Sequence, residues 1–277
     1  MKIVHIFFVR LKHYLITELR FLISLKLRSS IVKVNFDSIS FKLYTNSIFS
    51  WIRAKKIKNG KAEKALIDWG SRVEKGSSVL DVGSNFGLLS IYLAKKKINV
   101  ISVEPDLSNY LLLIQNINLN NINEFIKTFP IAINKKGIKF SKMFYVTLHQ
   151  AFDSINEQTS GRGDSTLFDE KDDDIHKNSY TVASLDLLSL IENQSNEITY
   201  IKIDIEDSIY LILNELKMLI ERKTIKSFYI ELSKKKKFLN LNNDLLKYAR
   251  EYKYEVSSSF SGATSTDYTF NRMIENY

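Results

Sequence analysis

The chain has 277 residues, enough for one large α/β domain with an extension, and it contains no cysteine. The lack of cysteine excludes a disulfide framework, thiolate metal sites and a cysteine nucleophile. Residues 1–61 carry 13 Lys and Arg against two acids (+11), whereas residues 62–277 carry 27 against 29 (−2). The sequence therefore predicts a basic N-terminal extension over residues 1–61 and a nearly neutral main domain over residues 62–277. This asymmetry argues against a nucleic-acid-binding role for the whole chain.

Residues 1–28 predict an amphipathic helix. Its apolar face is interrupted by Glu18, and most basic residues lie on the other face. Charged residues interrupt every apolar run, so neither a membrane span nor a secretory signal is expected. The helix either packs on its own domain or lies on an anionic membrane surface as a peripheral contact. We expect a cytoplasmic location in the first case and the inner membrane surface in the second. The apolar face consists of Ile3, Phe7, Leu11, Tyr14, Leu22 and Leu25.

The pattern after this helix is that of an α/β protein. Alternating apolar and polar residues over 31–45 predict a β-hairpin, and residues 65–73 (ALIDWGSRV) predict a helix. Buried strands then alternate with amphipathic helices, which is typical of a mostly parallel sheet with helices on both faces. Residues 254–259 and 267–274 predict a closing antiparallel pair. The expected strands span 79–83, 98–105, 125–133, 198–206 and 225–233, and the expected helices 87–97, 107–120, 208–220 and 241–252.

Residues 135–180 interrupt the alternation and predict a long polar loop. The tripeptide at 162–164 (RGD) resembles an adhesion motif by chance. The acids of 172–174 and His176 are interpreted as solvated, so no metal site is predicted. His149 is interpreted as incidental, although it could serve as a base.

The turn at residues 81–87 (DVGSNFG) follows a β-branched strand and opens a helix. The dinucleotide fingerprint G-x-G-x-x-G places a glycine where Asn85 stands here. Asp81 would repel a pyrophosphate but suits a cationic ligand such as S-adenosylmethionine, which has a sulfonium and no phosphate. Glu104 ends the next strand, where a carboxylate can accept hydrogen bonds from both ribose hydroxyls. The combination favours S-adenosylmethionine over a nicotinamide cofactor.

Five segments in order resemble the FkbM-type family of S-adenosylmethionine-dependent methyltransferases. They read VLDVGSNFGLLSIYLA, ISVEPD, LLLIQNINLNN, SLDLL and YIKIDIEDSIYLIL, and the similarity covers roughly residues 60–275. The resemblance implies a class I methyltransferase fold, Rossmann-like and built on a mostly parallel seven-stranded sheet. It also implies O-methylation, often of sugars or glycans. It assigns the turn around methionine and ribose to Asp81, Gly83, Ser84, Asn85 and Gly87, and the ribose contact to Glu104.

The last segment departs from the family pattern. Lys202, Asp204 and Glu206 match the family's K-x-D-x-E, but Asp207 replaces a glycine and Ile209 replaces a second glutamate. The turn therefore cannot use glycine at positive φ at position 207.

Asp204 and Glu206 are the candidate catalytic residues. They follow the fourth parallel strand, where ligands of such sheets bind, and strand alternation would place them on one face. Paired carboxylates can raise one pKa and create a general base for a hydroxyl acceptor. The alternative is that they cap the following helix at Ser208. Glu231, which ends the next strand, either faces the site or pairs with the lysines of residues 234–237.

The asparagines at 116, 118, 120 and 121 are interpreted as solvated residues at a helix end. Tyr268 and Phe270 are interpreted as core residues, with the wall of the acceptor site as the alternative. The leading function is O-methylation of a sugar, a glycan or another small hydroxyl acceptor. One alternative is a nucleic-acid methyltransferase that uses the basic extension to hold phosphates. Another is a non-catalytic, membrane-associated module that retains the fold.

Overall fold

The computed structural model describes residues 30–36, 38–144 and 179–273. The predicted helix over residues 1–28, His149, the tripeptide at 162–164 and the acidic run near 172–176 lie outside the described residues. The chain divides into two compact units, residues 1–64 and 65–277.

The smaller unit contains the predicted hairpin. β1 (Ser30–Phe36) pairs antiparallel with β2 (Ile39–Thr45), which confirms the prediction for residues 31–45. The inward residues of both strands are buried, as alternation requires. α2 (Ile48–Lys58) follows, and a capping box between Ser47 and Ser50 fixes its start. The buried strand residues are Val32, Val34, Phe41, Leu43 and Thr45.

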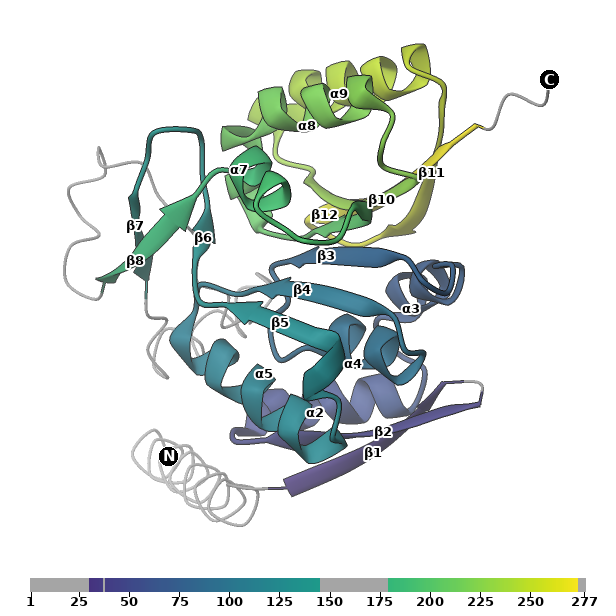
Figure 1. Ribbon diagram of the computed structural model, residues 1–277, viewed down its shortest axis with the longest axis vertical. Coiled ribbons are helices and arrows are strands. Elements are labelled where there is room, and N and C mark those ends of the chain that lie inside the picture. The colour runs from purple at the N-terminus through teal and green to yellow at the C-terminus, as the bar shows by residue number, and fades with distance from the viewer. Residues whose placement is uncertain (1–29, 37, 145–178, 274–277) are drawn as a thin grey trace, which may run out of the picture. The chain divides into compact units, whose positions relative to one another are not determined.

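The larger unit contains a seven-stranded sheet in the order β11-β12-β10-β9-β3-β4-β5 (Figure 1). Five of its strands run parallel, and β12 lies antiparallel between β10 and β11. This mostly parallel sheet confirms the class I methyltransferase architecture expected from the sequence. The strands are β3 (Ser78–Val82), β4 (Asn99–Val103), β5 (Ile126–Phe129), β9 (Ile198–Ile203), β10 (Ser227–Ser233), β11 (Tyr254–Ser261) and β12 (Ser265–Arg272).

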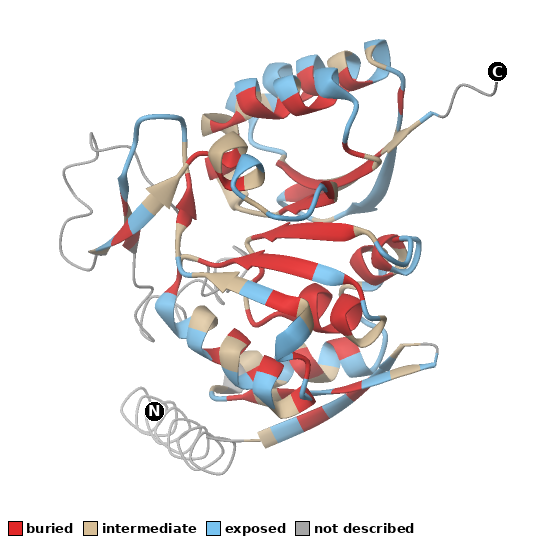
Figure 2. Ribbon diagram, in the orientation of Figure 1, coloured by how far each residue is buried: buried red, intermediate tan, exposed pale blue. Residues whose placement is uncertain are grey.

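Helices cover the sheet, and every residue of β3 is buried (Figure 2). A strand buried on both faces reads as a continuous apolar run, which is why SVLDV contains only one charge. Figure 1 shows α8 and α9 beside the β10–β12 part of the sheet. No helix among the described residues is both long and apolar enough to cross a membrane. The helices of this unit are α3 (Lys64–Ser71), α4 (Leu88–Lys95), α5 (Leu107–Asn120), α7 (Leu187–Glu192), α8 (Leu213–Arg222) and α9 (Leu239–Glu251).

Two parts of the sequence prediction are wrong. The strand predicted over 125–133 is divided, because Pro130 cannot donate a backbone hydrogen bond. Its second part, β6 (Ala132–Ile133), belongs to a small separate sheet with β7 (Phe140–Phe144) and β8 (Ser179–Leu185). Residues 140–144 and 179–180 are therefore strand, although a loop was expected over 135–180.

The helix predicted from residue 208 also begins later than expected. A 3₁₀ turn, η3 (Glu206–Leu211), precedes α8, which starts at Leu213. The predicted strand over 198–206 ends at Ile203, so Asp204 and Glu206 lie beyond it.

Candidate active site

The turn at residues 81–87 leaves β3 and opens α4 at the carboxyl edge of the sheet. The amides of Gly83 and Ser84 both donate to the carbonyl of Val103, at 2.9 and 3.0 Å. Three residues of the turn have positive φ: Gly83 (74°), Asn85 (52°) and Gly87 (90°). Asparagine tolerates this region better than most residues, and the amide of Phe86 donates to its side-chain oxygen at 2.8 Å. The turn therefore has a fixed backbone and needs glycine at only two of these positions.

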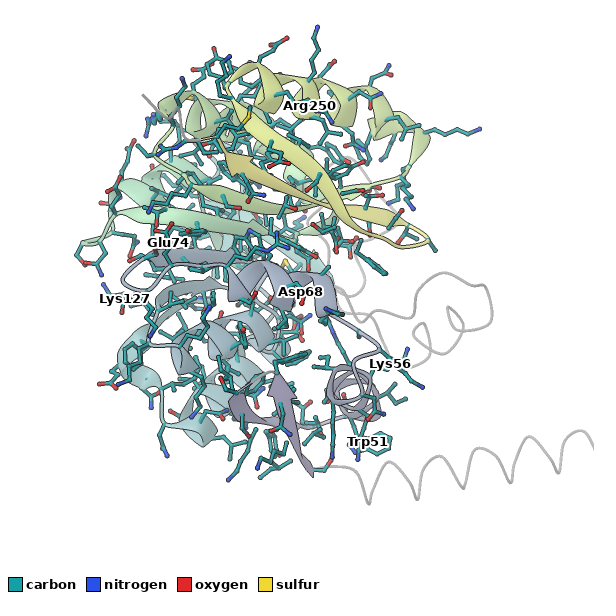
Figure 3. The ribbon with its side chains drawn as sticks, turned by 90° about the vertical axis from the view of Figure 1, so that its right-hand side faces the viewer. Trp51, Lys56, Asp68, Glu74, Lys127 and Arg250 are labelled. Carbon is teal, nitrogen blue, oxygen red and sulfur yellow. The ribbon has the colours of Figure 1, made fainter. Side chains whose placement is uncertain are left out.

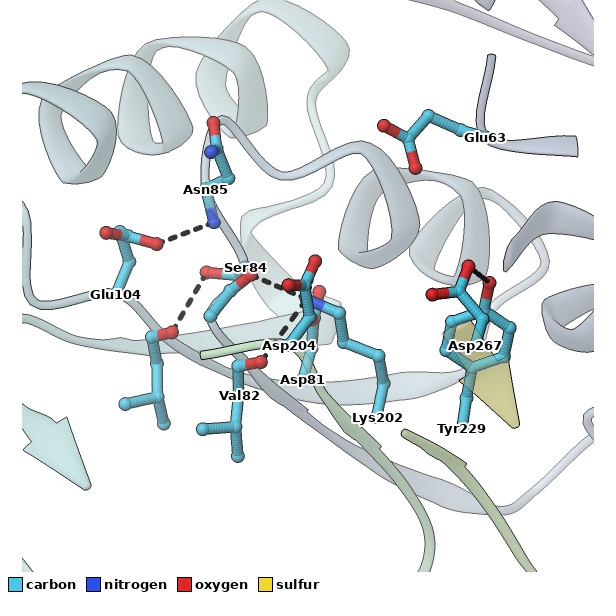
Figure 4. Close-up of polar contacts among 12 residues, drawn as sticks. Glu63, Asp81, Val82, Ser84, Asn85, Glu104, Lys202, Asp204, Tyr229 and Asp267 are labelled. Atoms are coloured by element: carbon cyan, nitrogen blue, oxygen red, sulfur yellow. Dashed lines mark hydrogen bonds and ion pairs between the residues drawn. The ribbon is translucent and has the colours of Figure 1, made fainter. Parts of the chain in front are cut away.

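Glu104 reaches from the end of β4 to this turn (Figure 4). Its carboxylate accepts the amide hydrogen of Asn85 at 2.7 Å and that of Asp106 at 2.9 Å. The residue is 5% exposed. Burial raises the pKa of Glu104 to about 7, although the two amide hydrogen bonds oppose this rise. Glu104, the residue predicted to bind the ribose, is thus hydrogen-bonded directly to the turn.

Asp81 lies beneath the turn rather than on its surface. It is 1% exposed. One oxygen, Oδ2, accepts a hydrogen bond from Ser90 at 2.6 Å, and the other lies 3.3 Å from Nζ of Lys202. Asp81 is therefore the counter-ion of a buried lysine, and it acts on the turn through that lysine.

Lys202 connects the turn with the end of β9 (Figure 4). Its Nζ donates to the carbonyl of Gly83 at 2.6 Å and lies 3.6 Å from a carboxylate oxygen of Asp204. Burial alone would lower the pKa of Lys202, but Asp81 and Asp204 raise it above its ordinary value. The lysine is therefore charged. In the sequence, Lys202 stands out only as a match to the family pattern, and its contact with the turn was not predicted.

The backbone of the turn touches the backbone at the end of β9. A Cβ atom built on Gly83 would lie 1.9 Å from the carbonyl oxygen of Asp204, so no side chain fits between them. The amide of Asp204 also donates to the carbonyl of Val82 at 3.1 Å. The close approach places the first candidate catalytic residue next to the turn.

Three carboxylates meet at this edge. Asp204, Glu206 and Glu231 each offer an oxygen within 4.8 Å of the others. Glu231 is 8% exposed, whereas Asp204 and Glu206 are half-buried. The structure therefore brings both predicted catalytic residues together with Glu231. Such a group can take up or orient a proton, and its oxygen atoms are also the ligand type that Mg²⁺ and Ca²⁺ prefer.

The geometry that joins Asp204 and Glu206 differs from the expected strand alternation. Glu206 has a φ of 51°, so the left-handed residue precedes Asp207 instead of being Asp207 itself. The carboxylate of Asp207 pairs with Lys235 at 2.6 Å. The N-cap position of η3 is held by Ile205, so neither candidate acid occupies it.

Asn116 supports the turn from α5, contrary to the expectation of a solvated residue. It is 0% exposed, and its side-chain amide donates to the carbonyl of Phe86 at 2.9 Å. Asn120 is buried as well, so the prediction is wrong for both residues. Their helical spacing from Leu112 and Leu113 places them on the apolar face, and this signal could have identified them.

The described residues around the turn suit an uncharged or cationic nucleoside-type ligand. The turn has a fixed backbone with three residues at positive φ, and the buried carboxylate of Glu104 beside it can accept hydrogen bonds from ligand hydroxyls. The carboxylates opposite the turn would repel a pyrophosphate. Ser84 is buried and faces inward, with its amide on the Val103 carbonyl.

Comparisons with known proteins agree with this geometry. A family model described as "Methyltransferase FkbM domain" matches residues 81–256. No curated protein matches.

Solved structures similar to this chain are distant relatives in sequence. The METTL16 MTase domain is 11% identical, with 90% of this chain and 88% of that chain covered and a TM-score of 0.48. Precorrin-6y C5,15-methyltransferase from Geobacter metallireducens is 8% identical, with coverage of 77% and 89% and a TM-score of 0.43. TYW2 from M. jannaschii, solved in complex with AdoMet, is 16% identical, with coverage of 89% and 87% and a TM-score of 0.39. Because these values are low, the family match identifies the chain and the three neighbours do not.

Proposed function

Because the chain belongs to the methyltransferase FkbM domain family, we propose that it transfers a methyl group from S-adenosylmethionine to a hydroxyl of a sugar, a glycan or another small acceptor. The observation that carries this proposal is the backbone contact between Gly83 and Asp204. This contact places a turn that can bind a nucleoside next to carboxylates that can orient or deprotonate a hydroxyl group.

Gly83, Asn85 and Gly87 give the turn its backbone conformation at positive φ, and Glu104 supplies a carboxylate for ribose hydroxyls. When bound, S-adenosylmethionine supplies a methyl group that its sulfonium has already activated. Lys202 and Asp81 fix the turn from below. The chain's own contribution is to align this cofactor with an acceptor and to exclude other orientations.

On the acceptor side, a hydroxyl is a poor nucleophile while it keeps its proton. Asp204 accepts that proton or orients the hydroxyl, and the carboxylates of Glu206 and Glu231 in the same cluster can share the proton that Asp204 takes up. Lys202 stays ionised beside Asp204 and balances the cluster from the buried side. A divalent cation held by the same oxygens would serve the same purpose by a different route.

Calorimetry on the full chain tests the cofactor assignment. S-adenosylmethionine should bind, and NAD should not, because the carboxylates of Asp204, Glu206 and Glu231 opposite the turn would repel its pyrophosphate. Absence of S-adenosylmethionine binding would refute the proposal.

The variant Asp204→Asn tests the catalytic assignment. Methyl transfer should fall by about 100-fold or more, as for loss of a general base. Binding of S-adenosylmethionine should change by less than about threefold, because Asp204 touches the turn through its backbone. Full activity in this variant would show that another residue takes the proton.

The acceptor can be identified with a deuterated methyl group on S-adenosylmethionine. Mass spectrometry of glycans from a deletion strain should reveal a missing O-methyl group, and the purified protein should restore it with the label. Label that appears in RNA instead of glycans would contradict the hydroxyl acceptor proposed here and favour the nucleic-acid alternative.

A further inference from the structure

A pocket lies at the amino-terminal edge of the central sheet, away from the candidate active site. It includes Ser227, the first residue of β10, whose register partners are Tyr200 of β9 and Asn271 of β12. The candidate active site lies at the other end of the same strands. Ser227 and Glu231 lie four residues apart on β10, so the pocket is about 13 Å along the strand from the carboxylates of the candidate active site. A small ligand in this pocket therefore does not touch the candidate active site.

The inner wall of this pocket is ordered by hydrogen bonds. The indole N–H of Trp69 donates to Oγ of Ser227 at 2.9 Å, and this hydroxyl donates to Oδ1 of Asn271 at 2.7 Å. The ring of Trp69 packs edge-on against Tyr200, with centroids 6.3 Å apart. The wall is thus held in place before any ligand binds, and ordering it adds no entropic cost to binding.

The rim of the pocket is basic. Among the described residues that line it, Arg72, Lys226 and Arg272 contribute three positive charges against one carboxylate, that of Glu74, which leaves a formal charge of +2. Figure 3 labels Glu74. The surrounding region, residues 62–277, has a formal charge of −2. The rim is therefore positively charged although the region around it carries a net negative charge.

Two of these charges already form a pair. Nζ of Lys226 lies 2.5 Å from a carboxylate oxygen of Glu74. The hydrogen bond between them lowers the pKa of Glu74 and raises the pKa of Lys226, so both are ionised at neutral pH. The guanidinium of Arg72 has no hydrogen bond or ion pair with any described residue. Arg72 is exposed at the rim and available to a ligand.

We propose that this pocket binds a phosphate group, either as inorganic phosphate or as the phosphate end of a small phosphorylated compound. One guanidinium group can donate two parallel hydrogen bonds to two oxygens of a phosphate. The formal charge of +2 on the rim is opposite to that of a phosphate dianion. The pocket volume of about 190 Å³ is below the range of drug-sized sites, so it fits a small group. This proposal does not depend on the proposed methyltransferase function.

The test is titration of the full chain with inorganic phosphate at constant ionic strength, with chloride as the reference salt. Calorimetry gives the dissociation constant, and thermal unfolding gives the stabilisation that binding produces. Arg72→Ala should weaken phosphate binding about tenfold, as expected for loss of a charge-assisted hydrogen bond. Because its guanidinium has no partner among the residues that the structure describes, this variant should fold like the wild type.

Two more variants make the test specific. Glu74→Gln removes the one carboxylate among the described residues of the rim and releases Lys226, so this variant should bind phosphate more tightly than the wild type. Arg250→Ala removes an exposed arginine on α9, which is not part of the pocket (Figure 3), and should leave binding unchanged. A general effect of net charge would weaken binding equally in the Arg72 and Arg250 variants and would overturn the proposal.

Glucose 6-phosphate and inorganic phosphate distinguish the two possible sources of the group. Tighter binding of the sugar phosphate identifies a site for phosphate esters, and equal binding identifies a site for the free anion. Absence of saturable phosphate binding, or binding that Arg72→Ala leaves unchanged, would show that the pocket is not a phosphate site.

Discussion

Replacing Glu104 by Gln should remove a large pH dependence from the stability of the ligand-free protein. Burial raises the pKa of Glu104 from its ordinary value of 4.5 to about 7. The folded protein therefore holds the proton more tightly than the unfolded chain, where the pKa returns to its ordinary value. The stabilisation from this group is complete below about pH 4.5 and is lost as the pH rises through about 7.

The size of the effect follows from the same pKa change. At about 1.4 kcal/mol for each pH unit, a rise from 4.5 to about 7 corresponds to about 3 kcal/mol in the free energy of unfolding. Since most domains have a free energy of unfolding of about 5–15 kcal/mol, this loss should be easy to measure.

Urea unfolding between about pH 5 and pH 8 measures the effect. The free energy of unfolding of the wild type should fall with rising pH by about 2–3 kcal/mol more than that of Glu104→Gln. The exposed Glu124, changed to Gln, is the matched control and should keep the wild-type dependence. Parallel pH curves for the wild type and Glu104→Gln would refute the reasoning, because they would show that Glu104 titrates equally in both states.

The same titration should affect cofactor binding. Ribose hydroxyls donate to an ionised carboxylate better than to a protonated one, so affinity for S-adenosylmethionine should rise between about pH 6 and pH 8. Calorimetry should show this rise in the wild type and not in Glu104→Gln. If the affinity of the wild type did not change with pH, Glu104 would not be the residue that binds the ribose.

Three further substitutions test the support of the turn. Gly83→Ala should lower the free energy of unfolding, measured in urea, by about 3 kcal/mol or more, because the positive φ and a backbone clash act together. The control Gly76→Ala has a positive φ but open space around the new Cβ, so it should lower the free energy of unfolding by only about 1–2 kcal/mol. Lys202→Met should cost about 3–5 kcal/mol in the same assay, and adding Asp81→Asn should recover part of this loss, since the uncompensated buried charge disappears. Asn116→Ala should weaken S-adenosylmethionine binding in calorimetry by about fivefold or more, because the amide that holds the turn is lost; unchanged affinity would exclude this positioning role.

Much of the fold could be predicted because the signals are local. The sequences of β3, β4, β9 and β10 are short apolar runs followed by turn residues, and periodicity identifies such runs. The division at Pro130 was also visible in principle, since proline lacks a donor, but nothing local shows that the chain then joins another sheet. Sheet membership depends on pairing between residues far apart in the sequence, such as Ala132 with Ser184.

The sequence identified candidate residues of the site but not the contacts between them. The motif residues Gly83, Glu104 and Asp204 could be chosen because each ends or follows a strand. The buried ion pair of Asp81 with Lys202 could not be recognised, because the two residues are 121 positions apart and either could have faced solvent. The burial of Asn116 was missed for a different reason: a polar side chain was assigned to water although the helical period placed it inside.

The direct contact between Gly83 and Asp204 has a thermodynamic consequence. No side chain separates the two backbones, so a movement of one segment displaces the other by nearly the same amount. Occupancy on the nucleoside side and occupancy on the hydroxyl side would then be linked equilibria, each altering the affinity of the other by the same factor. A single glycine would thereby make two recognition events interdependent, and cofactor and acceptor affinities measured separately would differ from those measured together.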